Sequence, residues 1–385
     1  MIVASEVVHT GEVHLEFNSC FLKIISQIFP DEKIVYRSEE QHAAAMAQQL
    51  QGSNIRFEPF PAYYDRRAYS WPKRIFGEMK TIYHSMRYGK KRQAAKYVWT
   101  CLFPTGHLFL VLLLRFLRSD RQHIIVLHGE LELLKVSGKR RSERFLGQIL
   151  RYAMKYSPCC VRYIVLGDSI LQNLRPHLSP AVLSKVISII HPYNYSGSAV
   201  TRSIPNTQPI KFGTIGTQML VKNSHYLFEL TSAFESDIQA GKLSFESIGQ
   251  VLSELEPYSN ALVDAKYSRD FVPQEQFEKA VETLDFVLFF YDNQSYELCA
   301  SGAVFEAIKR GVPIISIRND YFTWLFNAYG AMGILGYDLN DIKRIISKIV
   351  DGDMTTEISS ILTNITAFRK ENDLGKIASD LSKKL

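Results

Sequence analysis

A glycine and a carboxylate, spaced one helical turn apart, form the pattern in this chain that best suits a chemical role. Gly302 stands at the start of an expected helix, four residues before Glu306. The first N–H groups of a helix have no partners within it, and a residue without a side chain lets a phosphate approach them. A diphosphate at Ser301 and Gly302 would bring a ribose near Glu306, which can accept hydrogen bonds from its hydroxyls. The same pattern is also typical of a well-capped crossover helix that binds nothing.

The segments around this helix predict a β-α-β unit with its loop at the carboxyl end of a strand. An apolar run at 284–290 is followed by the loop DNQSYELCASG, the helix AVFEAIKR and a second apolar run at 313–317. Ser301 suits the N-cap, Gly311 suits the position after the helix, and Pro313 prevents the helix from continuing. Ligands of open α/β sheets bind at the carboxyl ends of strands, so we expect a binding site in this loop.

The segment from Glu306 to Ile314, EAIKRGVPI, resembles the signature of the family 4 (group 1) glycosyltransferases of the GT-B fold. The resemblance implies that Glu306 holds the ribose of a nucleotide-sugar donor. Members of that family often carry another glutamate eight positions earlier, where this chain has Leu298. Other members show a Tyr-x-x-x-x-Ser-Gly run, which is present here from Tyr296 to Gly302, and we therefore include Tyr296 in the expected donor site.

A lysine early in the second half extends the resemblance. A predicted strand at 209–216 ends in Gly216, and Lys222 follows at the expected head of a helix. The resemblance implies that a lysine here pairs with the donor diphosphate, although the arginine that often accompanies it is absent nearby. The alternative is a solvated lysine without a ligand.

Two further residues stand at the carboxyl end of a predicted strand in the first half. The sequence HIIVLHGELELL places His128 at the end of the strand 123–128, with Glu130 just beyond it. The resemblance implies that His128 contacts a hydroxyl of the donor sugar and positions the reacting centre. Glu130 is a candidate acid or base, but a glutamate in a first helical turn also serves the helix dipole alone.

The start of the chain resembles the first strand, flexible loop and first helix of the same family. In HTGEVHLEFNSC, Gly11 allows the loop to bend around an acceptor or a phosphate, and His14 and Asn18 lie one turn apart. We expect His14 and Asn18 to face the cleft between the two domains.

Along the chain, short apolar runs typical of strands alternate with helical patterns, and these elements position the residues named above. The runs are nearly continuous hydrophobic stretches, as strands of a parallel sheet covered on both faces require. With 385 residues, 46% of them hydrophobic, the chain has room for two cores. We expect an α/β protein of two Rossmann-like doubly wound domains that face a cleft, the GT-B architecture. The predicted divisions are an acceptor-binding domain at 1–200, a nucleotide-sugar-binding domain at 201–366 and a C-terminal helix at 367–385.

Residues 61–120 match no motif and carry much of the positive charge. From Arg66 to Arg121 there are 13 Lys and Arg against two acids. Apolar residues at 75, 79, 82 and 86 follow helical spacing and alternate with bases, which predicts a basic amphipathic helix at an anionic membrane surface. The alternative is a surface helix whose apolar stripe packs on its own domain. The predicted membrane-binding residues are Lys80, Arg87, Lys90, Lys91 and Arg92.

The patterns and the resemblance together predict a glycosyltransferase that moves a sugar from a UDP- or GDP-linked donor to a membrane-associated glycan acceptor, expected to be lipid-linked, in surface polysaccharide synthesis. The resemblance implies that the configuration at the anomeric carbon is retained. No H-x-x-x-H motif and no Cys/His cluster occurs, so we expect neither a metal nor another cofactor. No nucleic-acid module accompanies the basic segment, and we expect no nucleic-acid partner. The expected location is the cytoplasm, peripheral on the inner face of the cell membrane. Two alternatives are a noncatalytic subunit that binds a partner transferase or lipid, and a nucleotide-sugar 2-epimerase.

Overall fold

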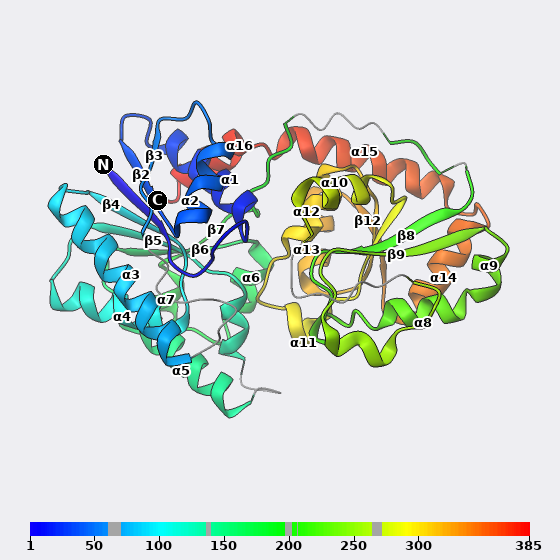
Figure 1. Ribbon diagram of the computed structural model, residues 1–385, viewed down its shortest axis with the longest axis horizontal. Helices are drawn as coiled ribbons and strands as arrows, with labels where there is room; N and C mark the ends of the chain where they lie inside the picture. Colours follow the sequence, from blue (N-terminus) through cyan, green and yellow to red (C-terminus); the bar gives the residue numbers. More distant parts are fainter. Residues whose placement is uncertain (61–70, 136–139, 197–201, 206, 264–271) are drawn as a thin grey trace. The chain divides into compact units, whose positions relative to one another are not determined.

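The computed structural model describes residues 1–60, 71–135, 140–196, 202–205, 207–263 and 272–385. These residues form two compact units, each built on a parallel sheet (Figure 1). The first unit comprises Met1–Asn194, Leu298–Ala300 and Leu374–Leu385, and the second comprises Tyr195–Glu297 and Ser301–Asp373. The predicted α/β class, with two doubly wound sheets, is confirmed. The predicted division at residue 200 lies outside the described residues.

The first unit contains seven described strands in the order β3-β2-β1-β4-β5-β6-β7, all parallel. The strands are β1 Ile2–Glu6, β2 Ile34–Arg37, β3 Ile55–Phe57, β4 Lys96–Cys101, β5 Gln122–Val126, β6 Val161–Val165 and β7 Val186–Ser188. The helices are α1 Leu15–Ile28, α2 Glu40–Gln49, α3 Trp71–Lys91, α4 Pro104–Phe116, α5 Arg141–Lys155, α6 Asp168–Asn173, α7 Pro180–Leu183 and α16 Leu374–Ser382, with a 3-10 turn η1 at Gly129–Leu134.

Helices cover both faces of this sheet. Helices α1, α2 and α16 lie on one face, and α3, α4 and α5 lie on the other (Figure 1). Alternate strand residues, such as Val98 and Ile124, join the core beneath α1 and α16. Their neighbours Tyr97 and His123, stacked 4.8 Å apart, point to the opposite face. Burial on both faces explains why the strands lack a polar alternation.

The second unit contains five described parallel strands in the order β12-β11-β10-β8-β9. The strands are β8 Ile210–Ile215, β9 Leu243–Ile248, β10 Phe286–Phe289, β11 Ile314–Ile317 and β12 Gly333–Gly336. The helices are α8 Tyr226–Ala233, α9 Glu235–Gln239, α10 Gln274–Glu282, α11 Asn293–Tyr296, α12 Gly302–Lys309, α13 Asp320–Tyr329, α14 Leu339–Val350 and α15 Thr355–Glu371, with 3-10 turns η2 Leu220–Lys222 and η3 Ser253–Tyr258. The core gathers around Phe212, Phe286 and Ile315 on the central strands.

Segment 61–120 differs most from its prediction. Where we expected an added membrane or acceptor element, the described part contains β4, a strand in the middle of the sheet, and the helices on either side of it. Trp99 is 1% exposed in this strand. The single expected helix at 367–385 is two helices, α15 and α16, separated at Asn372 and Asp373. Residues 61–70 lie outside the described part.

Candidate functional site

In the second unit, a glycine turn after β8 lies beside the start of α12, and a second glycine after β9 lets the two turns pack closely together. Gly216 follows β8 with φ +84°, a left-handed conformation that favours glycine. Its carbonyl oxygen would lie 2.4 Å from a Cβ added at Gly249, so the loops after β8 and β9 need a glycine there. A Cβ added at Gly216 would lie 3.6 Å from the Cβ of Ala303, in the first turn of α12. The structure therefore brings the predicted Gly216 beside the predicted helix start.

The start of α12 is open. Gly302 is exposed and is the first helical residue, and Ser301 occupies the N-cap as expected. The Ser301 hydroxyl does not cap the helix, because it donates to the Tyr291 hydroxyl at 3.3 Å instead. The first N–H groups of α12 therefore lack a side-chain cap, which leaves them suited to an anion. Gly311 ends the helix with φ +70°, which confirms the predicted C-terminal signal.

Lys222 faces a pair of aromatic rings beside this helix start. Tyr291 and Tyr296 stack with ring centres 4.3 Å apart. The Lys222 Nζ lies 5.5 Å from the centre of the Tyr291 ring and 6.0 Å from that of Tyr296, within the range of cation–π attraction. Because Tyr291 also bonds Ser301, the rings link Lys222 to the helix start. Lys222 ends the turn η2 rather than heading a helix, and α8 begins four residues later.

Three polar residues that the sequence did not single out hold this arrangement in place. Asn223, with φ 55°, donates from Nδ2 to the Phe290 carbonyl and to Asp292 Oδ2, both at 3.1 Å. Asp292 caps α11, which carries Tyr296, by accepting from two backbone N–H groups. From the other side, Asn319 Nδ2 donates to the Tyr291 carbonyl at 3.0 Å. The sequence signal for Asn223 was its residue type and place: an asparagine between Lys222 and a helix can adopt the left-handed backbone conformation of a turn.

Glu306 does not have the free carboxylate that the sequence suggested. The residue is 2% exposed, and its Oε1 accepts from Arg310 Nε at 2.9 Å. Arg310 also pairs with Glu278, at 2.6 Å, and with Glu282, both on α10. The prediction of a carboxylate open to ribose is therefore corrected: Glu306 lies buried in an ion-pair cluster that ties α12 to α10. The spacing that suggested a ligand role, one helical turn, also suits this i,i+4 pair with Arg310.

In the first unit, the predicted His128 and Glu130 line a cavity of about 350 Å³. Its walls come from the ends of β1, β4 and β5 and from α3 and α4. Its polar lining residues are His9, His14, Arg74, Glu78, Thr105, His128 and Glu130, and the remaining walls are largely apolar. The sequence did not predict a role for Arg74 or Glu78. Glu78 lies on the same helical face as Ile75 and Ile82. An acid on an otherwise apolar stripe was the sequence signal that could have indicated a buried functional carboxylate.

Desolvation in this cavity sets the protonation of its groups. It lowers the pKa of the His128 imidazole to about 4 and raises the pKa of the Glu130 carboxyl to about 7. His128 Nε2 lies 2.8 Å from the Thr100 carbonyl, which can only accept, so Nε2 carries the hydrogen and Nδ1 is the acceptor nitrogen. Burial also raises the pKa of Glu78 to about 8. Glu78 accepts from the Phe103 N–H at 2.8 Å, at the start of α4.

The three residues predicted near the chain start lie in different surroundings. His14 lines the cavity, with its ring centre 4.9 Å from that of His128. Gly11 adopts φ +58°, as a flexible loop residue would, but it is not among the residues that line the cavity. Asn18 is 0% exposed and donates from Nδ2 to Glu6 and Tyr36. The prediction that Asn18 faces a ligand is therefore corrected, since it belongs to a buried polar network.

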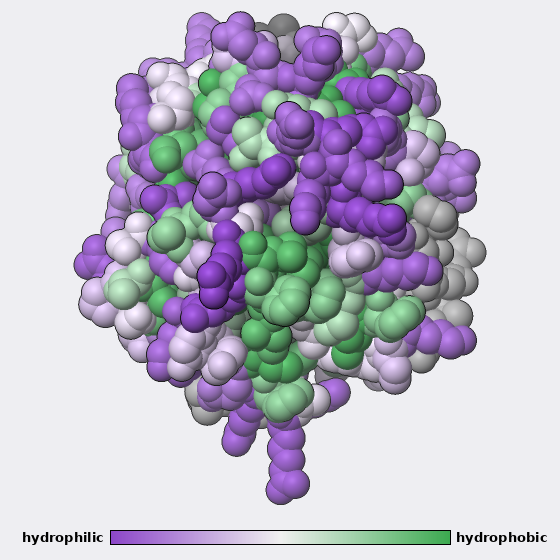
Figure 2. All heavy atoms as spheres, turned by 90° about the vertical axis from the view of Figure 1, so that its left-hand side faces the viewer, coloured by the Kyte–Doolittle hydropathy of each residue, from purple (hydrophilic) through white to green (hydrophobic). Residues whose placement is uncertain are grey.

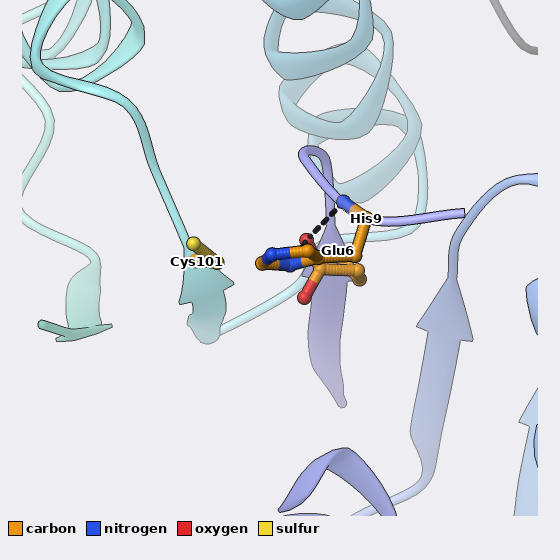
Figure 3. Close-up of side chains that lie close together, drawn as sticks. All are labelled: Glu6, His9 and Cys101. Carbon is orange, nitrogen blue, oxygen red and sulfur yellow. Dashed lines mark hydrogen bonds and ion pairs between the residues drawn. The ribbon is translucent and has the colours of Figure 1, made fainter. Parts of the chain in front are cut away.

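Glu6, His9 and Cys101 lie close together beside this cavity (Figure 3). Their potential ligand atoms all lie within 4.8 Å of one another, close enough to consider a metal. Both Glu6 oxygens already accept hydrogen bonds, Oε1 from the N–H groups of Val8 and His9 and Oε2 from Asn18 and Thr100. Burial keeps the pKa of the Cys101 thiol well above its usual range, so the thiolate that a metal needs is disfavoured. We assign Glu6 to shaping the loop after β1.

Leu298 occupies the place of the additional glutamate of the resembled family. Its side chain is fully buried, and its backbone N–H donates to Glu132 Oε1. Glu132 is 8% exposed and also pairs with Lys135 at 3.2 Å. The position therefore carries a structural contact within the first unit.

Helix α3 presents a different face to solvent than predicted. Ile82 and Met86, half of the stripe expected to face lipid, are 0% and 7% exposed and pack into the unit, which corrects that part of the prediction. The predicted bases Lys80, Arg87, Lys90, Lys91 and Arg92 are exposed. Large apolar side chains exposed on α3 and α4 are Trp71, Phe76, Tyr83, Leu112 and Phe116. Figure 2 shows the face of the molecule that includes these helices, with an apolar area inside a hydrophilic border.

None of the described helices is long and apolar enough to cross a membrane.

Comparison with known proteins finds similar folds among solved structures. No protein-family model matches the chain, and no curated protein sequence is significantly similar to it. Solved structures do match over their full length. Sucrose-phosphate synthase from Thermosynechococcus elongatus has a TM-score of 0.67 at 12% identity, with 100% of this chain and 98% of that chain covered. WaaG, a glycosyltransferase involved in lipopolysaccharide biosynthesis, has a TM-score of 0.66 at 12% identity, covering 100% and 99%. The lipopolysaccharide outer core galactosyltransferase WaaB has a TM-score of 0.61 at 10% identity, also covering 100% and 99%.

Proposed function

The chain has the GT-B fold of glycosyltransferases, and from this premise we propose that it transfers a sugar from a nucleotide diphosphate donor to a glycan acceptor. The observation that carries the proposal is the open start of α12 in the second unit. Exposed Gly302, uncapped N–H groups and a lysine beside them suit a diphosphate and occur where two glycines bring strand ends together. Lys222 supplies the positive charge for the departing diphosphate.

The reaction breaks the bond between the anomeric carbon and the diphosphate oxygen and forms one to the acceptor oxygen. In our proposal the acceptor attacks from the side on which the diphosphate leaves, so the configuration is retained, as the family resemblance implies. Glu130 takes the acceptor proton, supported by its pKa of about 7. His128 accepts a hydrogen bond from a hydroxyl of the donor sugar through Nδ1, which is left as the acceptor because Nε2 donates to the Thr100 carbonyl.

We further propose that no metal takes part, because Lys222 and the N–H groups at Gly302 supply the electrostatic stabilisation that a metal would otherwise give. A lipid-linked acceptor is supported by the exposed apolar and basic residues of α3 and α4. Two of the matched proteins, WaaG and WaaB, are glycosyltransferases of lipopolysaccharide. The protein would then work at the cytoplasmic face of the cell membrane, bound to its anionic surface.

Incubation with radiolabelled UDP- and GDP-sugars, with and without EDTA, tests this proposal. Transfer to a lipid extract, or slow hydrolysis of the donor, in the presence of EDTA is the expected result. Tight donor binding without turnover would instead indicate a noncatalytic subunit, and conversion of the donor sugar to its 2-epimer would indicate an epimerase. If no nucleotide sugar binds, the donor site at α12 is wrong.

The membrane part of the proposal has a separate test. Vesicles of phosphatidylglycerol and phosphatidylcholine should sediment the protein at low salt and release it at high salt, because screened charges attract weakly. Replacing Phe76 and Phe116 with serine removes the two most exposed large apolar side chains on α3 and α4 and should weaken sedimentation. Unchanged sedimentation of this variant would contradict an apolar contact with lipid.

A further inference from the structure

A second hollow of the first unit, of about 440 Å³, is lined mainly by bases. It lies between the end of β2, the residues after β3 and the second half of α3. Its lining residues are Arg37, Pro59, Phe60, His84, Arg87, Tyr88, Lys91 and Arg92. None of these described residues is acidic. Three of them, Arg87, Lys91 and Arg92, were predicted from the sequence to bind a membrane surface, and the structure gathers them around one concave site.

Arg37 gives this hollow a fixed cation. The residue is 9% exposed, and its Nη1 donates to the His84 carbonyl at 3.2 Å. Its guanidinium lies 4.4 Å from the centre of the Tyr88 ring and 5.8 Å from that of Phe60. A guanidinium held by packing loses little freedom when it binds, so it is well suited to recognise an anion.

The bases of this hollow stand close together. The Arg92 guanidinium lies 3.9 Å from the centre of the same Tyr88 ring, so one aromatic side chain contacts two cations. The nearby acid Glu58 pairs with Arg56 at 2.8 Å and does not line the hollow. Burial, followed by the charges of Lys80, Arg37 and Arg87, lowers the pKa of His84. Like charges held this close favour a bound anion that relieves their repulsion.

We propose that this hollow binds a phosphate group, held by Arg37, Arg87, Lys91 and Arg92. Guanidinium forks match the oxygens of a phosphate, and three of the four cations are arginines. The phosphate can belong to a soluble phosphorylated ligand or to the headgroup of a phospholipid, and both present the same oxyanion. This site goes beyond sugar transfer, because it uses none of the residues assigned to that reaction. Where the phosphate is a lipid headgroup, the site deepens the membrane part of the proposed function, on which it then rests.

Lysine acetylation read by mass spectrometry tests the site locally, with inorganic pyrophosphate as the probe. A local readout is needed because pyrophosphate would also bind at Lys222. Pyrophosphate should slow acetylation of Lys91 but not of Lys80 or Lys90, which belong to the same helix but do not line the hollow. An unprotected Lys91 in the unaltered protein would overturn the proposal.

Two double variants with the same change in charge separate a site from a diffuse positive field. Both retain Lys91 as the reporter, and thermal unfolding establishes that each is folded. Arg87→Gln with Arg92→Gln should raise the pyrophosphate concentration for half-protection of Lys91 roughly tenfold or more, since two charge-assisted hydrogen bonds are lost. Lys80→Gln with Lys90→Gln should change it less than about twofold. Equal shifts in the two variants would refute a defined site.

Vesicles of equal parts phosphatidylglycerol and phosphatidylcholine identify the source of the phosphate. If the Arg87 and Arg92 variant sediments less than the Lys80 and Lys90 variant, the hollow binds lipid headgroups. If the two variants sediment equally while only the first loses protection by pyrophosphate, the hollow binds a soluble phosphorylated ligand. Loss of neither interaction in the first variant would overturn the site.

Discussion

Replacing Glu306 with alanine should lower stability rather than donor affinity. The side chain is buried, and its carboxylate accepts a charge-assisted hydrogen bond from Arg310. Loss of such a bond costs about 1.5–3 kcal/mol. Because Glu278 and Glu282 still pair with Arg310, the larger penalty of an unpaired buried charge does not apply. Alanine recovers a few tenths of a kcal/mol in helix propensity, roughly. We therefore expect a loss of about 1–3 kcal/mol in the free energy of unfolding.

Thermal unfolding and calorimetry measure the two quantities separately. A loss of this size should lower the Tm of the second unit by roughly 2–12 °C, given about 2–4 °C per kcal/mol for a unit of this length. The affinity for UDP- or GDP-sugars should change less than about twofold, which is below 0.5 kcal/mol. The matched control is Glu278→Ala, which removes a partly exposed partner of the same arginine and should cost about 0–1 kcal/mol.

The opposite pattern would refute this reasoning. If Glu306→Ala unfolds like the unaltered protein but binds the donor at least about tenfold more weakly, a loss of 1.4 kcal/mol, the carboxylate contacts the ligand. The ribose role implied by the family resemblance would then hold, and the ion pair with Arg310 would contribute little to stability.

Five other predictions concern the site and the fold. Gly302→Val should weaken nucleotide-sugar binding roughly tenfold in calorimetry, because its side chain blocks the N–H groups of α12; unchanged affinity would contradict this role. Lys222→Gln should reduce kcat at saturating donor, and an unchanged kcat would contradict a role for Lys222. If Glu130 is the base, activity rises with pH through about 7, and Glu130→Gln should abolish that limb. Burial lowers the pKa of His123 to about 3, so its imidazole is neutral in the folded state. Because its unfolded pKa is near 6.5, this histidine makes the folded protein about 1 kcal/mol less stable at pH 5.5 than at pH 6.5, and His123→Asn should remove a loss of that size from the measured free energy of unfolding. Deletion of 374–385 should cause aggregation or loss of cooperative unfolding, because it uncovers α1; a soluble truncated protein with an unchanged Tm would contradict this.

The sequence predicted the strands best where both faces are buried by apolar residues. The β-α-β unit around α12 was predicted with its glycine and proline signals, since these depend on local backbone geometry. Strand β4 was missed because its apolar run, Tyr97 to Trp99, is only three residues long and stands between Lys96 and Thr100. The burial of this run depends on neighbouring strands far away in the sequence, and local patterns do not contain that information.

The candidate site shows the same division between local and distant information. The open start of α12 could be predicted, because it needs only a glycine at a helix end. The partner of Glu306 could have been read from the i,i+4 spacing to Arg310, but the second and third carboxylates come from α10. Asn18 was assigned to a ligand because helical spacing shows which residues share a face, whereas only the fold shows what covers that face. Ile82 on α3 was placed toward lipid for the same reason: its helical spacing shows the apolar face but not that this face packs into the first unit.

Helix α16 has a consequence for how the protein is made. It follows the second unit in the sequence, yet Ile377, Ala378 and Leu381 pack into the core of the first unit against α1. During synthesis on the ribosome, the core of the first unit therefore cannot close until residues 374–382 have been made. The apolar surface of α1 stays uncovered while the whole second unit is translated, and it is a natural binding site for chaperones in that interval.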